Sequence, residues 1–509
     1  MNLTIVSIVG AYLVVVLLIG LWATGRTKTS GDFYIAGRSL GVFVMAIAVF
    51  SSIQSGFGVV GGTSTVTAGG FGFVSGVMIA TPLGFALTWI MLGKRMMNVG
   101  DMGEMYTVGD IAELRYKSPA ARGVVGLTVA LGVLGYLGTQ VLAMGIVVAA
   151  IFDVSTTTGA MIGMGVLGLY VIGGGILAGV YTDLFQGVLM LVVSFVAFYF
   201  ALDSGGGVAS MTRTLQAEAP DLVTPFGLSP WVTIPCWIFL FSLGGSAQPH
   251  GMTKFLMLKE RGSLRWGPLI SGTGYAITTL MVLGIGSAVS VLTLRGEFPA
   301  MDSPDEAFTR YLTDFTPPVV AGLVIAGLLA AIMSTGSSFL TLGAASAVRD
   351  IPKAFNITVR RELLWSRIAV GVLLVLSTAF ALYIDNVVAL LGTFGWGTFA
   401  ASLFPALVLG MMWKGGTKEA AISSALIGII LNFVLEVGGK YGWKPLPEGV
   451  VVGAFTFAVT LIVYIGVSMA TRGRSDAPET ELASVIDGGP ALLEPATASQ
   501  TVSEGSARP

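Results

Sequence analysis

The chain has 509 residues, of which 54% are hydrophobic and 11% are charged, and its formal net charge is -1. Soluble domains carry about a quarter charged residues, so this composition excludes an ordinary soluble protein and indicates an integral membrane protein. The nearly neutral balance argues against nucleic acid as a partner. With one cysteine, Cys236, and one histidine, His250, the chain cannot form an intrachain disulfide or a histidine metal cluster.

Long apolar runs recur along the chain, and each helix that crosses a bilayer needs about 20 mostly apolar residues. The runs predict an all-α fold with about thirteen transmembrane helices, centred near residues 13, 53, 82, 137, 168, 193, 238, 278, 332, 376, 400, 428 and 460. The first run, within residues 1–30, has neither a basic leader nor a clear cleavage site, so we expect a spanning helix rather than a signal peptide.

Basic residues are divided unequally between the two sets of predicted loops. Of the 27 Lys and Arg residues, five fall on one side: Arg213, Arg295, Arg310, Lys440 and Lys444. All the others fall on the opposite side, which the positive-inside rule makes cytoplasmic. This split predicts a multi-pass protein of the cell (inner) membrane, with its N-terminus outside and its C-terminus in the cytoplasm. Residues 438–472 would form the last spanning helix, and residues 473–509, rich in Ser, Pro, Glu and Ala, a disordered cytoplasmic tail.

Two spans are interrupted by glycines and polar residues, at 51–73 and at 242–255. Broken backbone is tolerated at membrane depth only where it is buried in protein or lines a wet cavity. Paired breaks in two halves of a chain are typical of the binding site of secondary transporters. Glycines also permit close helix packing, but packing does not require Gln54, Gln248 or Pro249.

Polar groups also gather in two other spans. Ser334, Thr335, Ser337 and Ser338 lie close together at 334–338, which taken alone would favour a hydroxyl-rich packing seam. Asp183 is the one acidic residue that we expect inside a span. Ionisable residues in spans suggest function, but Asp183 could equally cap a helix through backbone N–H groups.

Four segments, in order, resemble motifs of the sodium:solute symporter family, which includes carriers of proline, pantothenate, sialic acid and galactose. They are GDFYIAGRSLG (31–41), GGILAGVYTDLFQG (174–187), AAIMSTGSSFLTLGAASAVRDI (330–351) and MMWKGGTKEAAISSALIGI (411–429). The resemblance implies a five-plus-five inverted-repeat (leucine-transporter-like) core, expected over residues 31–437. It also implies alternating access, Na+ as coupling ion, no other cofactor and no enzymatic activity.

The same resemblance implies three groups of site residues. The first sodium site would comprise Ser51, Gln54, Ala331, Ser334 and Thr335. A second sodium site would comprise Asp183, Ser334, Ser337 and Ser338. The solute would meet Ser55, Gly56, Gln140, Phe241, Gly245, Pro249 and Trp396. Hard cations prefer oxygen ligands, and neutral oxygens hold an ion that must leave again in every cycle.

The solute is less closely defined. Residues 245–255 resemble the corresponding segment of proline and pantothenate carriers, but Ile53 stands where the proline carrier has an aspartate. We therefore expect a small amino acid such as proline, or a carboxylate such as pantothenate or a monocarboxylate. The alternatives are a proton-coupled carrier of the same fold or a channel. Few buried acids and histidines argue against protons, and His250 is more simply explained as a partner for freed carbonyls. A channel would need a continuous polar pore. No arginine lies in a predicted span, so we expect no fixed cationic clamp.

Overall fold

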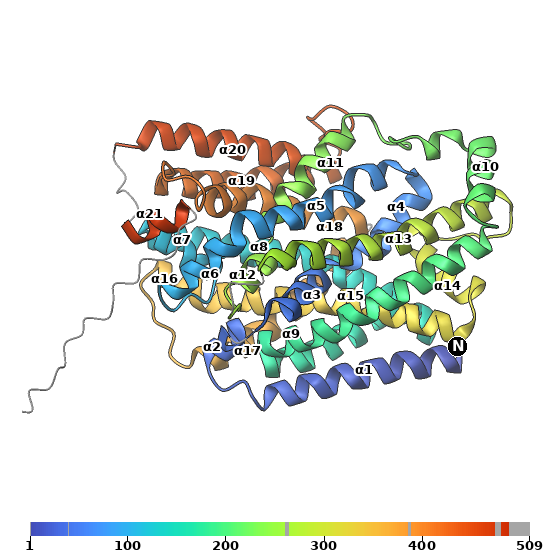
Figure 1. The fold of residues 1–509 in the computed structure, drawn as a ribbon, viewed down its shortest axis with the longest axis horizontal. Coiled ribbons are helices and arrows are strands. Elements are labelled where there is room, and N and C mark those ends of the chain that lie inside the picture. Colours follow the sequence, from blue (N-terminus) through green and yellow to red (C-terminus); the bar gives the residue numbers. More distant parts are fainter. Residues whose placement is uncertain (1, 39, 260–263, 385–387, 474–479, 488–509) are drawn as a thin grey trace, which may run out of the picture.

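The structure is a computed structural model that describes residues 2–38, 40–259, 264–384, 388–473 and 480–487. Most of this described chain is helical, and the long helices run side by side along one axis of the molecule (Figure 1). Within these described ranges, ten helices are long and apolar enough to cross a membrane, or eleven with one bent pair counted as a span. The protein is therefore an all-α, multi-pass membrane protein, as predicted.

The helices that build the bundle follow in chain order. They are α1 (Leu3–Thr24), α3 (Val42–Ile53), α4 (Gly62–Gly69), α5 (Ala80–Thr88), α6 (Lys94–Asp101), α8 (Pro119–Phe152), α9 (Thr156–Ser204), α11 (Thr233–Ser242), α12 (Pro249–Phe255), α13 (Gly267–Leu294), α15 (Pro318–Ala345), α17 (Glu362–Ile384), α18 (Val388–Leu403), α19 (Lys418–Lys440) and α20 (Val452–Thr471). Shorter helices connect them: α2 (Ser30–Ile35), α7 (Val108–Tyr116), α10 (Val208–Glu218), α14 (Ala307–Phe315), α16 (Ile351–Ala354) and α21 (Thr480–Ile486).

Two helices break in the middle of the bundle, where the sequence predicts interruptions. α3 ends at Gln54, whose extended backbone (φ −69°, ψ 122°) stops the helix. The chain becomes helical again from Phe57 and runs into α4 at an angle of 58° to α3. α11 is likewise followed by a short turn and by extended Gln248, and α12 starts at Pro249. Proline suits a first helical position because its missing N–H would have no partner there.

The longest helix, α9, comprises two spans. Its 49 residues leave helical geometry at Gly175 (φ 55°, ψ −142°), a conformation almost confined to glycine. A Cβ atom at this position would lie 2.7 Å from the Phe33 carbonyl oxygen. Counting α9 as two spans and α11 with α12 as one broken span extends the eleven to the thirteen that the sequence predicts.

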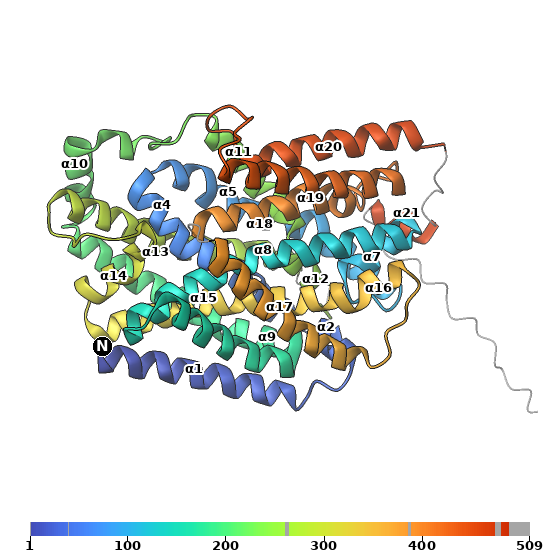
Figure 2. The same cartoon turned by 180° about the vertical axis from the view of Figure 1, so that it is seen from behind.

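The predicted loops that hold most of the Lys and Arg residues, among them Arg115 of α7 and Lys353 of α16, lie at one end of the bundle (Figure 1). α2, α7, α16 and α21 lie at one end, which we call the basic end, whereas α10 and α14 lie at the other (Figures 1 and 2). At the basic end, buried Arg122 forms ion pairs with Asp110 (2.7 Å), Glu113 (2.8 Å) and Asp350 (2.9 Å). Asp350 is fully buried in the continuation of α15. Asp350 lies near the end of that helix, so the expectation that Asp183 is the one acidic residue inside a span stays a prediction.

Part of the C-terminal tail is ordered. α21 lies against α6 and buries Leu482, Val485 and Ile486, and Arg95 Nε donates a hydrogen bond to the Ile486 carbonyl (3.2 Å). The expectation of a disordered tail therefore does not extend to Thr480–Ile486. The rest of that expectation, at 474–479 and 488–509, lies outside the described residues.

Candidate functional site

The first group of predicted ion ligands comes together where α15 crosses the break in α3. The Thr335 hydroxyl donates to the carbonyls of Ser52 (2.9 Å) and Gln54 (3.0 Å). The Ser334 hydroxyl donates to the Ser51 carbonyl (2.8 Å). Both hydroxyls also approach the carbonyl of Ala331, at 3.2 Å and 3.1 Å. The structure therefore unites the five residues of this group and adds the carbonyl of Ser52, which the sequence did not single out.

This cluster consists of neutral oxygens that can face a cation. The break in α3 leaves carbonyls to which no helical N–H donates, and the hydroxyls of α15 donate to them instead. If the two hydroxyls turned their protons away, their lone pairs and these carbonyls could coordinate a hard monovalent ion without a carboxylate. Ser334 and Thr335 are fully buried, and so is Ser51, so the arrangement also excludes bulk water.

The second group of predicted ion ligands contains a cation of its own. Lys254 Nζ lies 2.8 Å from Asp183 Oδ2, and both side chains are fully buried. The sequence places Lys254 among cytoplasmic loop charges, which is wrong: it belongs to α12, and all seven residues of this helix are buried. Asp183 lies eight residues beyond Gly175 and pairs with Lys254 rather than capping a helix.

Of the hydroxyls predicted for the second group, Ser337 donates to the Ser334 carbonyl (2.9 Å). Its oxygen also lies near Gly179, one turn before Asp183. The Ser338 hydroxyl has no hydrogen-bond partner within the described chain. Ser337 thus lies beside α9, but within the described residues no hydrogen bond joins Ser337 or Ser338 to the Asp183 carboxylate.

The predicted solute residues form a polar part and an aromatic part. In the polar part, the Gly56 amide donates to Gln140 Oε1 (3.0 Å). The Ser55 hydroxyl lies 3.1 Å from the Tyr136 hydroxyl. Gln140 approaches Gly56 closely, because a Cβ atom on that glycine would lie 3.2 Å from Oε1. These contacts place α8 directly against the break in α3.

The aromatic part lies where α11 and α18 meet the first broken helix. Phe241 contacts Trp396 with ring centroids 4.9 Å apart, and Phe57 stacks on Phe241 with ring centroids 5.8 Å apart. A Cβ atom at Gly245 would come within 3.7 Å of Trp396. Pro249, the remaining predicted residue, begins α12 and is buried. Phe57 was not predicted, although it directly follows the predicted pair Ser55 and Gly56.

Several buried polar atoms at these breaks have no hydrogen-bond partner within the described residues. They are Ser51 Oγ, both amide atoms of Gln54, Gln140 Nε2, Gln248 Oε1 and both ring nitrogens of His250. His250 instead makes an edge contact with Phe339, at 4.5 Å between centroids. The expected hydrogen bonds from His250 to freed carbonyls are therefore not seen. Buried polar atoms without hydrogen bonds are costly. The concentration of such atoms at the two breaks makes this region a candidate site for a polar ligand.

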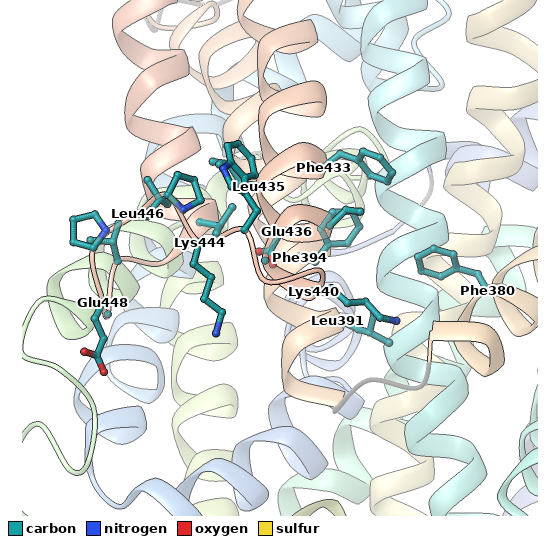
Figure 3. Close-up of a pocket in the computed structure, with 18 residues that line it drawn as sticks. Phe380, Leu391, Phe394, Phe433, Leu435, Glu436, Lys440, Lys444, Leu446 and Glu448 are labelled. Carbon is teal, nitrogen blue, oxygen red and sulfur yellow. The ribbon is translucent and has the colours of Figure 1, made fainter.

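An open hollow of about 670 Å³ lies elsewhere, on the outer flank of α18. Figure 3 shows that Leu391 and Phe394 of α18 face it together with Phe380, Phe433 and Glu436. Trp396 is two residues beyond Phe394, about 200° around the helix. The hollow and the aromatic part of the candidate site therefore lie on opposite sides of α18, and the site itself is enclosed.

Comparisons with known proteins agree with this architecture. A sequence model of the sodium:solute symporter family matches residues 33–428. The high-affinity proline transporter PutP of Bacillus subtilis (strain 168) is 26% identical and covers 91% of this chain and 97% of its own. The sodium/pantothenate symporter of Escherichia coli (strain K12) is also 26% identical, with 90% and 96% covered.

Solved structures share the fold. A Na+-coupled sialic acid symporter, solved in a substrate-bound outward-open state, superposes with a TM-score of 0.75 at 18% identity and covers 94% of this chain and 99% of its own. Mhp1, a nucleobase-cation-symport-1 family transporter, gives a TM-score of 0.51 at 15% identity, with 90% and 99% covered.

The helical fold and its two interrupted helices together define a secondary transporter of the leucine-transporter-like class. The chain belongs to the sodium:solute symporter family. The resemblance drawn from four sequence motifs and the expected fold class are confirmed.

Proposed function

We propose that this protein is a sodium-coupled symporter that imports a small organic solute by alternating access. The observation that carries the proposal is the cluster formed by Ser334, Thr335 and the carbonyls at the α3 break. One sodium ion would bind there between α3 and α15. Because every ligand is neutral, the ion could both bind and leave. Binding would also join the two helices, which couples ion occupancy to the shape of the core.

The solute that best suits the enclosed site is an amino acid such as proline, or a small carboxylate such as pantothenate or a monocarboxylate. Both amide atoms of Gln54 and Nε2 of Gln140, which have no hydrogen-bond partner among the described residues, supply donors and an acceptor. The rings of Phe57, Phe241 and Trp396 supply an apolar wall. A carboxylate would be met by the N-terminal end of the half-helix that starts at Phe57, where backbone N–H groups carry partial positive charge. Among the relatives, proline and pantothenate symporters support this class of solute.

The basic end would face the cytoplasm of the cell membrane. This orientation follows from the charge split of the loops and places the N-terminus outside.

The experiment is uptake into proteoliposomes that contain the purified protein. Proline, pantothenate and monocarboxylates would be offered under an inward sodium gradient, a potassium gradient or a pH gradient. We expect accumulation of one solute with sodium alone, and a Thr335→Ala variant that needs much more sodium. Uptake driven equally by potassium would overturn the proposal. Uptake driven by the pH gradient alone would favour the proton-coupled alternative, and passive flux of many solutes would favour a channel.

A further inference from the structure

The ammonium group of Lys254 is fully buried inside the bundle and is bound by groups of two helices. Lys254 Nζ donates to the Ala48 carbonyl of α3 (2.6 Å) and to Asp183 Oδ2 of α9 (2.8 Å). The side chain is fully buried, as is that of Asp183. One side chain from α12 thus connects both broken helices to the helix that carries the acidic residue.

The position of this contact relates it to the first ion cluster. Ala48 precedes Ser51 and Ser52 by about one helical turn, and the carbonyls of those two serines accept from Ser334 and Thr335. The ammonium therefore occupies the next level of α3 toward the basic end.

Charge balance explains why the ammonium belongs there. A buried carboxylate without a cation is strongly disfavoured, and a buried ammonium without an anion equally so. Lys254 and Asp183 neutralise one another, and among the described residues this carboxylate has no other hydrogen bond or ion pair, its Oδ1 being without a partner there. A sodium ion added beside Asp183 would place a second positive charge next to the ammonium, in a region where screening by water is weak.

We propose that Lys254 is the resident cation of the Asp183 cluster and takes the place of a second sodium ion. The inference rests on the proposed sodium-coupled function and assigns to it one sodium ion per transport cycle. Ser337 and Ser338 then serve helix packing around the ion pair, and Ser337 already donates to a backbone carbonyl. The fixed positive charge of Lys254 thereby determines how many sodium ions the core binds.

The first test counts sodium ions on the unmodified protein. Equilibrium binding of radioactive sodium to the purified transporter, in the presence of the solute, should give about one ion per protomer. The sodium dependence of uptake should have a Hill coefficient near one. Two ions per protomer, or a Hill coefficient near two, would overturn the inference while leaving sodium coupling intact. The absence of any sodium dependence would instead contradict the proposed function.

The second test changes the pair. Lys254→Met leaves Asp183 without its cation, so we expect a second sodium ion to bind and the Hill coefficient to rise toward two. Lys254→Arg keeps the charge and should stay near one. Lys254→Met combined with Asp183→Asn removes both charges and should also stay near one. A Lys254→Met protein that binds sodium with an unchanged count would contradict the inference, and if this variant fails to fold, the count on the unmodified protein decides.

Discussion

Gln54 and Gln248 occupy equivalent places in two different helices, with nearly the same backbone geometry. Gln54 has φ −69° and ψ 122°, and Gln248 has φ −71° and ψ 116°. Each follows a helix at mid-bundle and precedes a new helical segment. Each also keeps a side-chain oxygen without a hydrogen-bond partner in the described structure. The two breaks thus share the same local backbone geometry, as an inverted-repeat core requires.

Replacing Thr335 with alanine should weaken sodium binding in particular. The hydroxyl contacts three carbonyls, of Ser52, Gln54 and Ala331, and its oxygen is one of the proposed ion ligands. We expect the sodium concentration for half-maximal uptake to rise about tenfold or more, corresponding to about 1.4 kcal/mol or more. Sodium titrations of solute uptake would measure this change.

Thr341→Ala supplies the matched control for that measurement. Thr341 lies on the same helix and is buried, but its hydroxyl donates within α15 to the Ser337 carbonyl. Its sodium dependence should match that of the unmodified protein, and Thr335→Ser should retain most of the affinity. Equal losses in the alanine variants at 335 and 341 would show that the hydroxyl at 335 has no special role.

Replacing Gln140 with leucine should weaken solute binding more than sodium binding. The Gln140 side chain accepts from the Gly56 amide, and its Nε2 has no hydrogen-bond partner among the described residues. A hydrogen bond to a charged solute group contributes about 1.5–3 kcal/mol, so the solute concentration for half-maximal uptake should rise about tenfold or more. Asn432→Leu is the control, because Asn432 donates to Thr398 of α18 (2.9 Å) from α19. If both variants change solute affinity alike, Gln140 does not contact the solute.

The breaks could be predicted because their signals are local, whereas the residues of the first ion cluster follow from the family resemblance. Glutamine and proline inside apolar spans have few explanations other than interrupted helices, and paired hydroxyls in such a span stand out. Lys254 could not be found in this way. It lies five residues after Pro249 and shortly before Lys259, so the neighbouring sequence predicts the start of a charged loop.

Lys254 is buried because of tertiary contacts that its local sequence does not reveal. α12 continues for seven residues past the break, every one of them buried, and Asp183 meets Lys254 from 71 residues earlier in the chain. Arg122 and Asp350 were missed for the same reason, since 228 residues separate them. In each case the partner that makes burial tolerable is remote in sequence.

Removing the charge of Arg122 should destabilise the basic end strongly. The guanidinium pairs with Asp110, Glu113 and Asp350, and breaking a buried ion pair by removing one partner costs about 3–5 kcal/mol. Arg122→Met should therefore unfold at a clearly lower temperature in a detergent thermal-shift measurement.

Arg310→Met is the comparison variant for Arg122. Arg310 pairs with Glu306 at 2.9 Å, but the two side chains keep 35% and 26% of their exposure. Exposed pairs contribute about 0–1 kcal/mol, so the unfolding temperature should barely move. Similar shifts for the two variants would contradict a special role for the Arg122 cluster.

Gly175→Ala should disrupt the turn between the two spans of α9. The backbone at Gly175 (φ 55°, ψ −142°) is strained for any residue with a side chain, at about 1–3 kcal/mol. The added methyl group would also lie 2.5 Å from the Phe33 ring and 2.7 Å from the Phe33 carbonyl oxygen, so α2 or α9 must move. Gly165→Ala lies in the same helix with no atom within 4 Å of the new Cβ, and alanine favours helix over glycine by about 1 kcal/mol. The unfolding temperature should therefore fall for the variant at 175 and stay level or rise for the variant at 165. A variant at 175 as stable as the unmodified protein would mean that the chain does not turn at this glycine.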